Sequence, residues 1–174
     1  MSRLQPDSDN DRKNEYLDKI SENSTRLMRS MSDIVWSINP TNDSMQKIIT
    51  RMREFAASVL EPKNIEYSFQ VQEEVKELKL DMESRQDIFL IFKEAMNNLA
   101  KYANCKNARI DIRMNKLSLI LLIQDDGTGF DPVTTEAGNG LGNMQKRAAS
   151  LKGKLVIDSA PDAGTRVVLE VPVS

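Results

Sequence analysis

The sequence contains no histidine among its 174 residues, and this absence excludes several kinds of active site. Without an imidazole side chain, the chain cannot supply a serine–histidine pair, a histidine general base or a histidine-liganded zinc site. It contains a single cysteine, Cys105, so an internal disulfide is excluded. We interpret Cys105 as a small loop residue before a strand, in a protein from a reducing compartment.

Long apolar runs and a strong net charge are also missing. No run approaches the roughly 20 apolar residues that cross a bilayer, and the polar N-terminus lacks the apolar centre of a signal peptide. The formal net charge of −2 gives no general attraction to nucleic acid or anionic lipid. We therefore expect a cytoplasmic chain without nucleic-acid or membrane contact, which is compatible with a longer parent protein anchored in the inner membrane.

Apolar spacing divides the chain into a polar beginning, a long helix and a larger domain. Residues 1–10 are predicted to be a disordered lead-in, residues 11–43 a helix with its linker, and residues 44–174 a compact domain. In the helix, apolar side chains recur at intervals of three and four, a heptad-like pattern. This stripe consists of Leu17, Ile20, Leu27, Met31, Ile34 and Ile38. It fits either packing on its own domain or pairing with another helix, and its regularity favours pairing.

The larger domain alternates helical and strand patterns. In order, the sequence predicts a helix at 44–60, a strand at 65–71, a helix at 83–103, strands at 108–114 and 117–124, a helix at 143–151, and strands at 154–160 and 165–172. The segment 73–82 is predicted to be a polar connection with a short extended piece. Because neighbouring strands form hairpins and the helices lie on one side, this order indicates an α+β two-layer sandwich.

The long helix carries a polar triplet on one face. Glu94, Asn98 and Lys101 are spaced by four and three residues, so their side chains lie together. Asparagine competes for backbone hydrogen bonds inside a helix, so its presence there needs a reason. A carboxylate, an amide and an ammonium group together could hold Mg²⁺ and phosphate oxygens; a solvated face is the alternative. The stripe predicted to face the core consists of Ile88, Phe92, Ala95, Leu99 and Tyr102.

Two glycine-rich segments follow. The first, residues 125–129, comes directly after an apolar strand, and its glycines let backbone approach a ligand closely. The second, residues 138–143, stands immediately before a predicted helix and could present backbone N–H groups to phosphate. It lacks both the lysine of a Walker loop and the β-α-β surroundings of a dinucleotide-binding fingerprint. Each segment alone is a weak signal, and a turn would explain the first one equally well.

In this order and on these elements, the three motifs together resemble the N, G1 and G2 boxes of one ATPase superfamily. That superfamily includes histidine kinases, gyrase, Hsp90 and MutL, and the resemblance covers residues 62–174. It implies the two-layer Bergerat (HATPase) fold, with ATP and Mg²⁺ as cofactors.

The resemblance also implies a role for each matching residue. Glu94 matches the acid that orients metal-bound water, Asn98 matches the magnesium ligand and Lys101 matches a phosphate-contacting position. Asp125 matches the acceptor for the adenine amino group, and Thr165 matches a position that supports this contact. The remaining matches belong to the glycine boxes and the phosphate loop: Gly127, Gly129, Gly138, Gly140, Leu141 and Gly142.

The local sequence makes the resemblance more specific: it is similar to sensor kinases. Residues 141–147 resemble the corresponding segment of sensor kinases of the nitrate-sensor and desaturase-thermosensor class. Bacterial hybrid kinases contain very similar sequences. Residues 31–40 resemble the end of the second dimerisation helix in such kinases. Two departures stand out: Tyr102 occupies a position where many relatives have histidine, and the first dimerisation helix with its phosphoacceptor histidine is missing. We interpret the chain as part of a longer kinase rather than as a natural degenerate kinase.

The function implied by this resemblance is phosphoryl transfer in a two-component system. The γ-phosphoryl group of Mg·ATP would pass to a histidine on another polypeptide, and this chain alone would not autophosphorylate. The implied partners are a phosphoacceptor helix of the same kinase family, a downstream response-regulator receiver domain, and a second copy through helix 11–38. Two alternatives remain at this point: a nucleotide- or partner-binding module without turnover, and a slow ATPase in which Glu94 activates water.

Overall fold

The computed structural model describes residues 44–131 and 139–173, together with residues 16, 17, 20, 21, 24 and 31. The chain divides into two compact units, Met1–Asn42 and Asp43–Ser174. In the first unit the described residues are helical and exposed, and they include three members of the predicted stripe, Leu17, Ile20 and Met31. The other three members and the predicted lead-in lie outside the described residues.

The second unit alternates helices and strands. Its helices are α2 (Met45–Leu60), α3 (Glu73–Lys76), α4 (Met82–Asn98) and α5 (Asn139–Ser150), with a 3-10 turn η2 (Glu61–Lys63) and a π-helical turn η3 (Leu99–Ala103). Its strands are β1 (Glu66–Val71), β2 (Asn107–Asn115), β3 (Ser118–Asp125), β4 (Lys154–Ser159) and β5 (Thr165–Pro172). None of the helices in these described ranges is long and apolar enough to cross a membrane.

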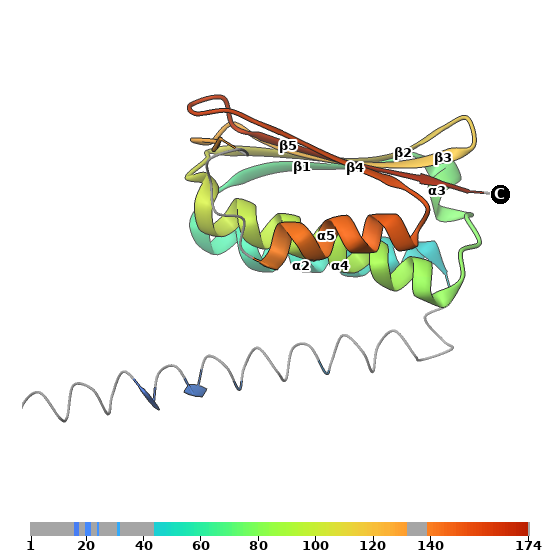
Figure 1. Ribbon diagram of the computed structural model, residues 1–174, viewed down its shortest axis with the longest axis horizontal. Helices are drawn as coiled ribbons and strands as arrows, with labels where there is room; N and C mark the ends of the chain where they lie inside the picture. The colour runs from blue at the N-terminus through green and yellow to red at the C-terminus, as the bar shows by residue number, and fades with distance from the viewer. Residues whose placement is uncertain are drawn as a thin grey trace, which may run out of the picture. The chain divides into compact units, whose positions relative to one another are not determined.

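Helices and strands form two layers in this unit (Figure 1). Within the described ranges, five strands make one sheet in the order β1-β2-β3-β5-β4. β1 runs parallel to β2, whereas the β2–β3, β3–β5 and β4–β5 pairs are antiparallel. The long helices α2, α4 and α5 cover one face of the sheet. The predicted α+β two-layer sandwich is therefore confirmed.

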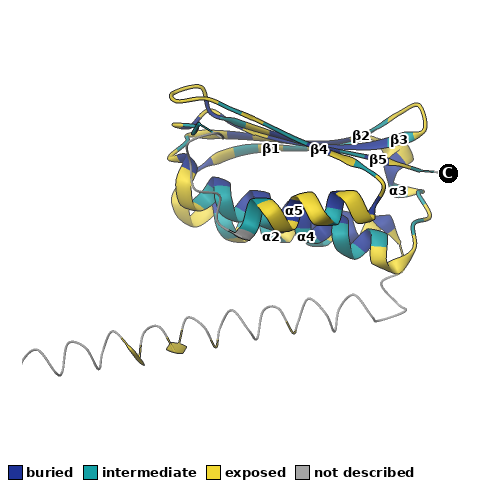
Figure 2. Cartoon of the chain, in the orientation of Figure 1, coloured by how far each residue is buried: buried dark blue, intermediate teal, exposed yellow. Residues whose placement is uncertain are grey.

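The core lies between the two layers, where each long helix buries one stripe of apolar side chains (Figure 2). Ser44 caps α2, because its hydroxyl accepts a hydrogen bond from the backbone N–H of Lys47. Asp81 caps α4 in the same way, with its carboxylate accepting the backbone N–H of Ser84 at 2.8 Å. The ring of Phe55 on α2 meets two rings of α4 edge-on. α4 also contacts α5, so it lies between α2 and α5.

Three predicted details are wrong. The segment 73–82 contains the helix α3 instead of an extended piece, because Val75 is fully buried and anchors a helical turn. Helix α5 begins at Asn139, before the predicted start at 143, so part of the predicted glycine loop is helical. Tyr102 was expected in the core but is 72% exposed. The π-helical turn η3 changes the residues per turn and so rotates Tyr102 out of the stripe.

Candidate functional site

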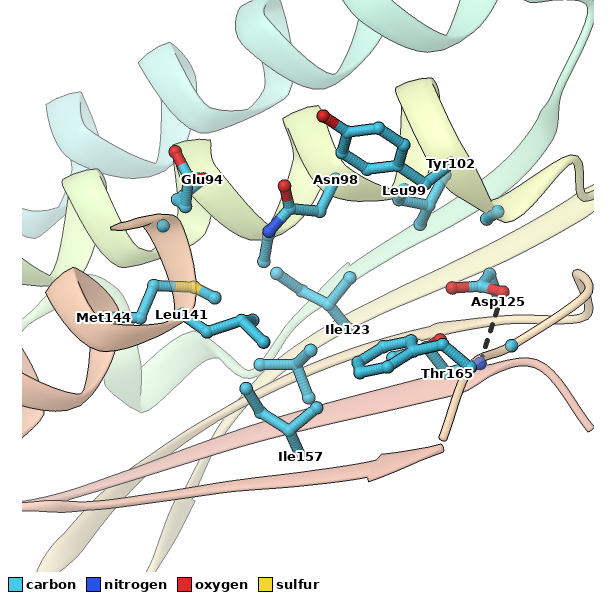
Figure 3. Close-up of a pocket in the computed structure, with 16 residues that line it drawn as sticks. Glu94, Asn98, Leu99, Tyr102, Ile123, Asp125, Leu141, Met144, Ile157 and Thr165 are labelled. Atoms are coloured by element: carbon cyan, nitrogen blue, oxygen red, sulfur yellow. Dashed lines mark hydrogen bonds between the residues drawn. The ribbon is translucent and has the colours of Figure 1, made fainter. Parts of the chain in front are cut away.

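A cavity of about 620 Å³ opens between the helix layer and the sheet, near the ends of β3 and β4 (Figure 3). α4 and η3 form one wall, α5 forms another, and strands β3, β4 and β5 form the floor. The lining is mostly apolar with a few polar groups, which is typical of a small-molecule site. The lining residues are Glu94, Ala95, Asn98, Leu99, Tyr102, Ala103, Ile123, Asp125, Gly129, Phe130, Gly140, Leu141, Met144, Ile157, Thr165 and Val167.

Asp125 is the buried carboxylate of this cavity, at the last position of β3. Its Oδ1 accepts hydrogen bonds from the backbone N–H of Gly127 at 2.9 Å and of Thr165 at 3.3 Å. Burial is the main cause that raises the pKa of Asp125; the two backbone N–H groups lower it in part, and the charge of Asp126 raises it further. Since both described bonds end on Oδ1, the other oxygen can accept a hydrogen bond from a ligand.

The loop after Asp125 is locked against two neighbouring segments. A side chain at Gly127 would collide with the carbonyl of Ala103 at the end of η3, and the N–H of Thr128 donates to that same carbonyl at 2.7 Å. Gly129 has φ +59° and lies against the carbonyl of Ala160 after β4, a position that favours glycine both by conformation and by space. The glycines of the Asp-x-Gly-x-Gly segment were predicted to let backbone approach a ligand. In the structure they let the loop pack closely against neighbouring backbone, and Gly129 lies in the cavity wall.

The polar triplet of the long helix is only partly brought together. Glu94 and Asn98 lie one turn apart on α4 and both line the cavity (Figure 3). Lys101 is exposed and is not among the lining residues, because it follows the start of η3, where the helix is wider. The predicted shared face therefore holds for Glu94 and Asn98, whereas Lys101 lies off it.

The second glycine-rich segment contributes the first turn of α5. Gly140 and Leu141 line the cavity, and a side chain at Gly140 would collide with the carboxylate of Glu94. Gly142 faces open space with nothing within 4 Å of the point where a Cβ would stand. Gly138 lies outside the described residues. The α4 carboxylate thus sits directly against the beginning of α5.

Several lining residues were missed by the sequence analysis. Ile123, Ile157 and Val167 come from three strands and meet on the floor, because Ile123 pairs with Val167 and Val167 pairs with Ile157. The alternation of each strand shows which residues point inward, but not that these three strands are neighbours. Ser159 was also missed; its Oγ contacts the backbone of Phe130 and the hydroxyl of Thr165, both in the cavity lining.

The donor set fits a magnesium ion that is shared with phosphates better than an all-protein metal site. Within residues 44–131 and 139–173, there is no group of three or more Cys, Asp or Glu side chains placed to hold a metal. Glu94 and Asn98 supply hard oxygen atoms on one wall of the cavity. Magnesium is commonly held by one or two such groups plus substrate phosphates.

The sequence and the fold are similar to those of known proteins. A sequence model described as "Histidine kinase-, DNA gyrase B-, and HSP90-like ATPase" matches residues 83–174. The signal transduction histidine-protein kinase/phosphatase DegS of Brevibacillus brevis is 33% identical over 88 residues, which are 50% of this chain and 23% of DegS. The oxygen sensor histidine kinase NreB of Staphylococcus carnosus is 33% identical over 98 residues, which are 55% of this chain and 28% of NreB.

Solved structures show the same fold at low identity. The Acinetobacter baumannii histidine kinase AdeS is 14% identical with a TM-score of 0.66, over 98% of this chain and 87% of the AdeS chain. The matched segments span only about a quarter of the curated relatives' length. The family model's match at residues 83–174 includes all of the residues that line the cavity.

Proposed function

Because the chain belongs to the family of histidine kinase-, DNA gyrase B- and HSP90-like ATPases, we propose that its cavity binds Mg·ATP for phosphoryl transfer to a histidine. The observation that carries this proposal is the placement of Asp125, Glu94 and Asn98 around one apolar cavity. A buried carboxylate at one end and two oxygen donors on a helix wall match the two ends of a nucleotide, its base and its phosphates.

The base would occupy the end of the cavity beside Asp125. The outer oxygen of this carboxylate accepts a hydrogen bond from an exocyclic amino group, and the apolar floor of Ile123, Ile157 and Val167 packs against a flat ring. A ring with a carbonyl oxygen at the same position would place two acceptors together. This end of the cavity therefore favours an adenine nucleotide.

The phosphates would lie between α4 and the first turn of α5. Asn98 and Glu94 would hold Mg²⁺ there together with phosphate oxygens, and the ion would neutralise the charge of the phosphoryl group during transfer. Glu94 lies against Gly140, so its carboxylate is already at the place where the phosphates would meet α5. The chain's own residues bind, orient and exclude water, and form no covalent bond with the substrate.

The accepting histidine lies outside this sequence, because these 174 residues contain none. We propose residues 11–43 as part of a dimerisation helix with its linker, residues 44–174 as the ATP-binding domain, and the helix at 11–38 as the contact with a second copy. The described stripe residues Leu17, Ile20 and Met31 are 53%, 60% and 64% exposed, and such a row of apolar side chains favours a helical partner. A response-regulator receiver domain would accept the phosphoryl group afterwards.

The first experiment is a calorimetric titration with Mg·ADP. We expect binding in the micromolar to millimolar range, about −4 to −8 kcal/mol. Asp125→Asn should weaken binding by about 1.5–3 kcal/mol, because the cavity loses the acceptor for the amino group. Asn98→Ala should chiefly reduce the dependence of affinity on magnesium. Equal affinity of the wild type and Asp125→Asn would overturn the placement of the base.

The second experiment separates a kinase from a binding module. The chain is incubated with γ-labelled ATP and Mg²⁺, with and without a separate helical hairpin that carries the phosphoacceptor histidine of a relative. We expect no label on this chain and slow labelling of the hairpin, abolished by Glu94→Ala; transfer is slow because the two parts are not linked. If the chain binds nucleotide but never labels a hairpin, a nucleotide-binding module without turnover is the better description.

A further inference from the structure

The hydroxyl of Ser159, at the last position of β4, is the centre of a hydrogen-bond network. Its Oγ lies 2.9 Å from the backbone nitrogen of Phe130, 2.9 Å from the carbonyl oxygen of Gly164, and 3.0 Å from Oγ1 of Thr165. Ser159 is half-buried and is not among the residues that line the cavity, whereas Phe130 and Thr165 both are. Any effect of Ser159 on a ligand therefore passes through these neighbours.

The chemistry of the three partners determines where the protons lie. A backbone N–H can only donate, so Phe130 donates to Ser159. A carbonyl oxygen can only accept, so the single hydroxyl proton of Ser159 goes to Gly164. With that proton used, the contact between Ser159 and Thr165 is a hydrogen bond only if Thr165 donates. This arrangement satisfies all three contacts at once.

Because its proton is donated to Ser159, the hydroxyl of Thr165 can only accept a hydrogen bond from a ligand in the cavity. Its neighbour Asp125, whose Oδ1 receives the backbone N–H of Thr165, is also an acceptor when ionised. Two side chains at the base end of the cavity thus accept hydrogen bonds, and neither donates one. The two N–H donors of an exocyclic amino group suit this pair. A carbonyl oxygen at the same position faces two acceptors and loses its hydrogen bond with water.

We propose that Ser159 is a positioning residue for base selection: it holds the Thr165 hydroxyl as an acceptor, so that the cavity prefers a 6-aminopurine nucleotide over a 6-oxopurine nucleotide. This inference rests on the proposed nucleotide-binding function and deepens it. Without Ser159, the Thr165 hydroxyl can turn and donate to a carbonyl oxygen of the ligand.

The test measures the affinities of Mg·ADP and Mg·IDP by calorimetry and takes their ratio. Ser159→Ala should lower the ratio of ADP to IDP affinity about tenfold, the value of one hydrogen bond. Ser159→Thr keeps a hydroxyl at this position and should change the ratio less than about twofold. Ser118→Ala is the matched control, since Ser118 is also a half-buried serine at a strand end but does not line the cavity.

A double-mutant cycle shows whether the effect passes through Thr165. In a Thr165→Val background, Ser159→Ala should no longer change the ratio. If Ser159→Ala lowers the ratio equally in the Thr165→Val background, the proposal is overturned. It is also overturned if Ser159→Ala weakens ADP and IDP binding equally, because that is the result of a purely structural role. If Ser159→Ala does not fold, an unchanged ratio in Thr165→Val overturns it.

A wild type that binds neither nucleotide overturns the proposed function. A wild type that binds ADP, with an unchanged ratio in the variants, overturns this inference only.

Discussion

Asp125 and Asp126 are consecutive residues whose carboxylates have opposite surroundings. Asp125 is buried in the cavity floor, and burial raises its pKa. Asp126 is exposed and accepts three hydrogen bonds, from the backbone of Lys106 and from the backbone and side chain of Asn107. The side-chain hydrogen bond of Asn107 is the main cause that lowers the pKa of Asp126. One carboxylate faces the ligand site, and the other ties the loop before β2 to the loop after β3.

Asp125→Asn should make the nucleotide-free chain more stable at neutral pH while it weakens nucleotide binding. The folded state raises the pKa of Asp125 above the ordinary value of 3.8, so it binds this proton more tightly than the unfolded chain does. The ionised carboxylate therefore costs stability above its folded pKa, and this cost disappears as the pH falls to 3.8 and below. Thermal unfolding of both proteins across this range measures it, and equal midpoints at neutral pH would contradict it.

The raised pKa of Asp125 also predicts that nucleotide binding depends on pH. Oδ1 of Asp125 accepts two backbone N–H groups, so a proton bound by this carboxyl lies on the other oxygen, the one proposed to accept the amino group. Affinity for Mg·ADP should therefore fall as the pH drops through the raised pKa. The fall should begin at a higher pH than an ordinary aspartate would give. Asp126→Asn removes the charge that raises the pKa of Asp125 further, so in this variant the fall should begin at a somewhat lower pH than in the wild type.

The two glycines of α5 should respond differently to alanine. Gly142→Ala should stabilise the chain by about 0.5–1 kcal/mol, because alanine is the better helix former and the site is open. Gly140→Ala should lose this benefit, because its methyl group meets the Glu94 carboxylate. In a Glu94→Ala background, Gly140→Ala should stabilise like Gly142→Ala. Denaturant unfolding of the variants measures these differences, and equal effects of the two alanines in the wild-type background would show that Glu94 does not press on α5.

The ion pair between Asp87 on α4 and Arg147 on α5 should contribute modestly to stability. Its side chains are 19% and 39% exposed, so we expect Arg147→Met to cost about 0.5–1.5 kcal/mol, and less at high salt. Lys146→Met, at the exposed neighbouring position, should cost almost nothing. Exchanging the two charges, Asp87→Arg with Arg147→Asp, should recover part of the loss. A loss that persists unchanged in molar salt would point to packing of the arginine stem instead.

Cys105 should react slowly with thiol reagents. Burial, and then the negative charges of Asp125 and Asp126, raise the pKa of its thiol from 9.0 to about 11. Since the thiolate is the reactive form, alkylation by iodoacetamide near pH 8 should be about a hundredfold slower in the folded chain than in urea. Equal rates in the two states would show that the thiol is neither buried nor held neutral.

The sequence alone was sufficient for the parts of the site that depend on local spacing. Glu94 and Asn98 share a face because residues four apart in any helix do so, and Asp125 reaches the cavity because it ends an apolar strand. These are short-range properties, and the family motifs rest on them. The two predicted hairpins are confirmed for the same reason, since each joins neighbouring strands.

The parts that failed depend on tertiary contacts or on irregular helix geometry. No local pattern predicts the pairing of β3 with β5, which brings Ile123 beside Val167. The π-helical turn after Asn98 changes where Lys101 and Tyr102 point, and helical periodicity assumes that no such turn exists. Residues 139–142 read as loop because of their glycines, yet contacts of α5 with α4 stabilise them as helix.

The pairing of β3 with β5 also determines when the site can form during folding. β2–β3 and β4–β5 are hairpins of adjacent strands and can form independently, whereas the bond from Thr165 to Asp125 spans 40 residues and crosses the seam between them. Contacts of such sequence separation form late, because the chain entropy of closing the loop must be lost first. The proposed recognition of the base therefore depends on both hairpins and can arise only when they dock. A chain that is interrupted at that step would have both halves of the cavity floor but not the proposed binding site.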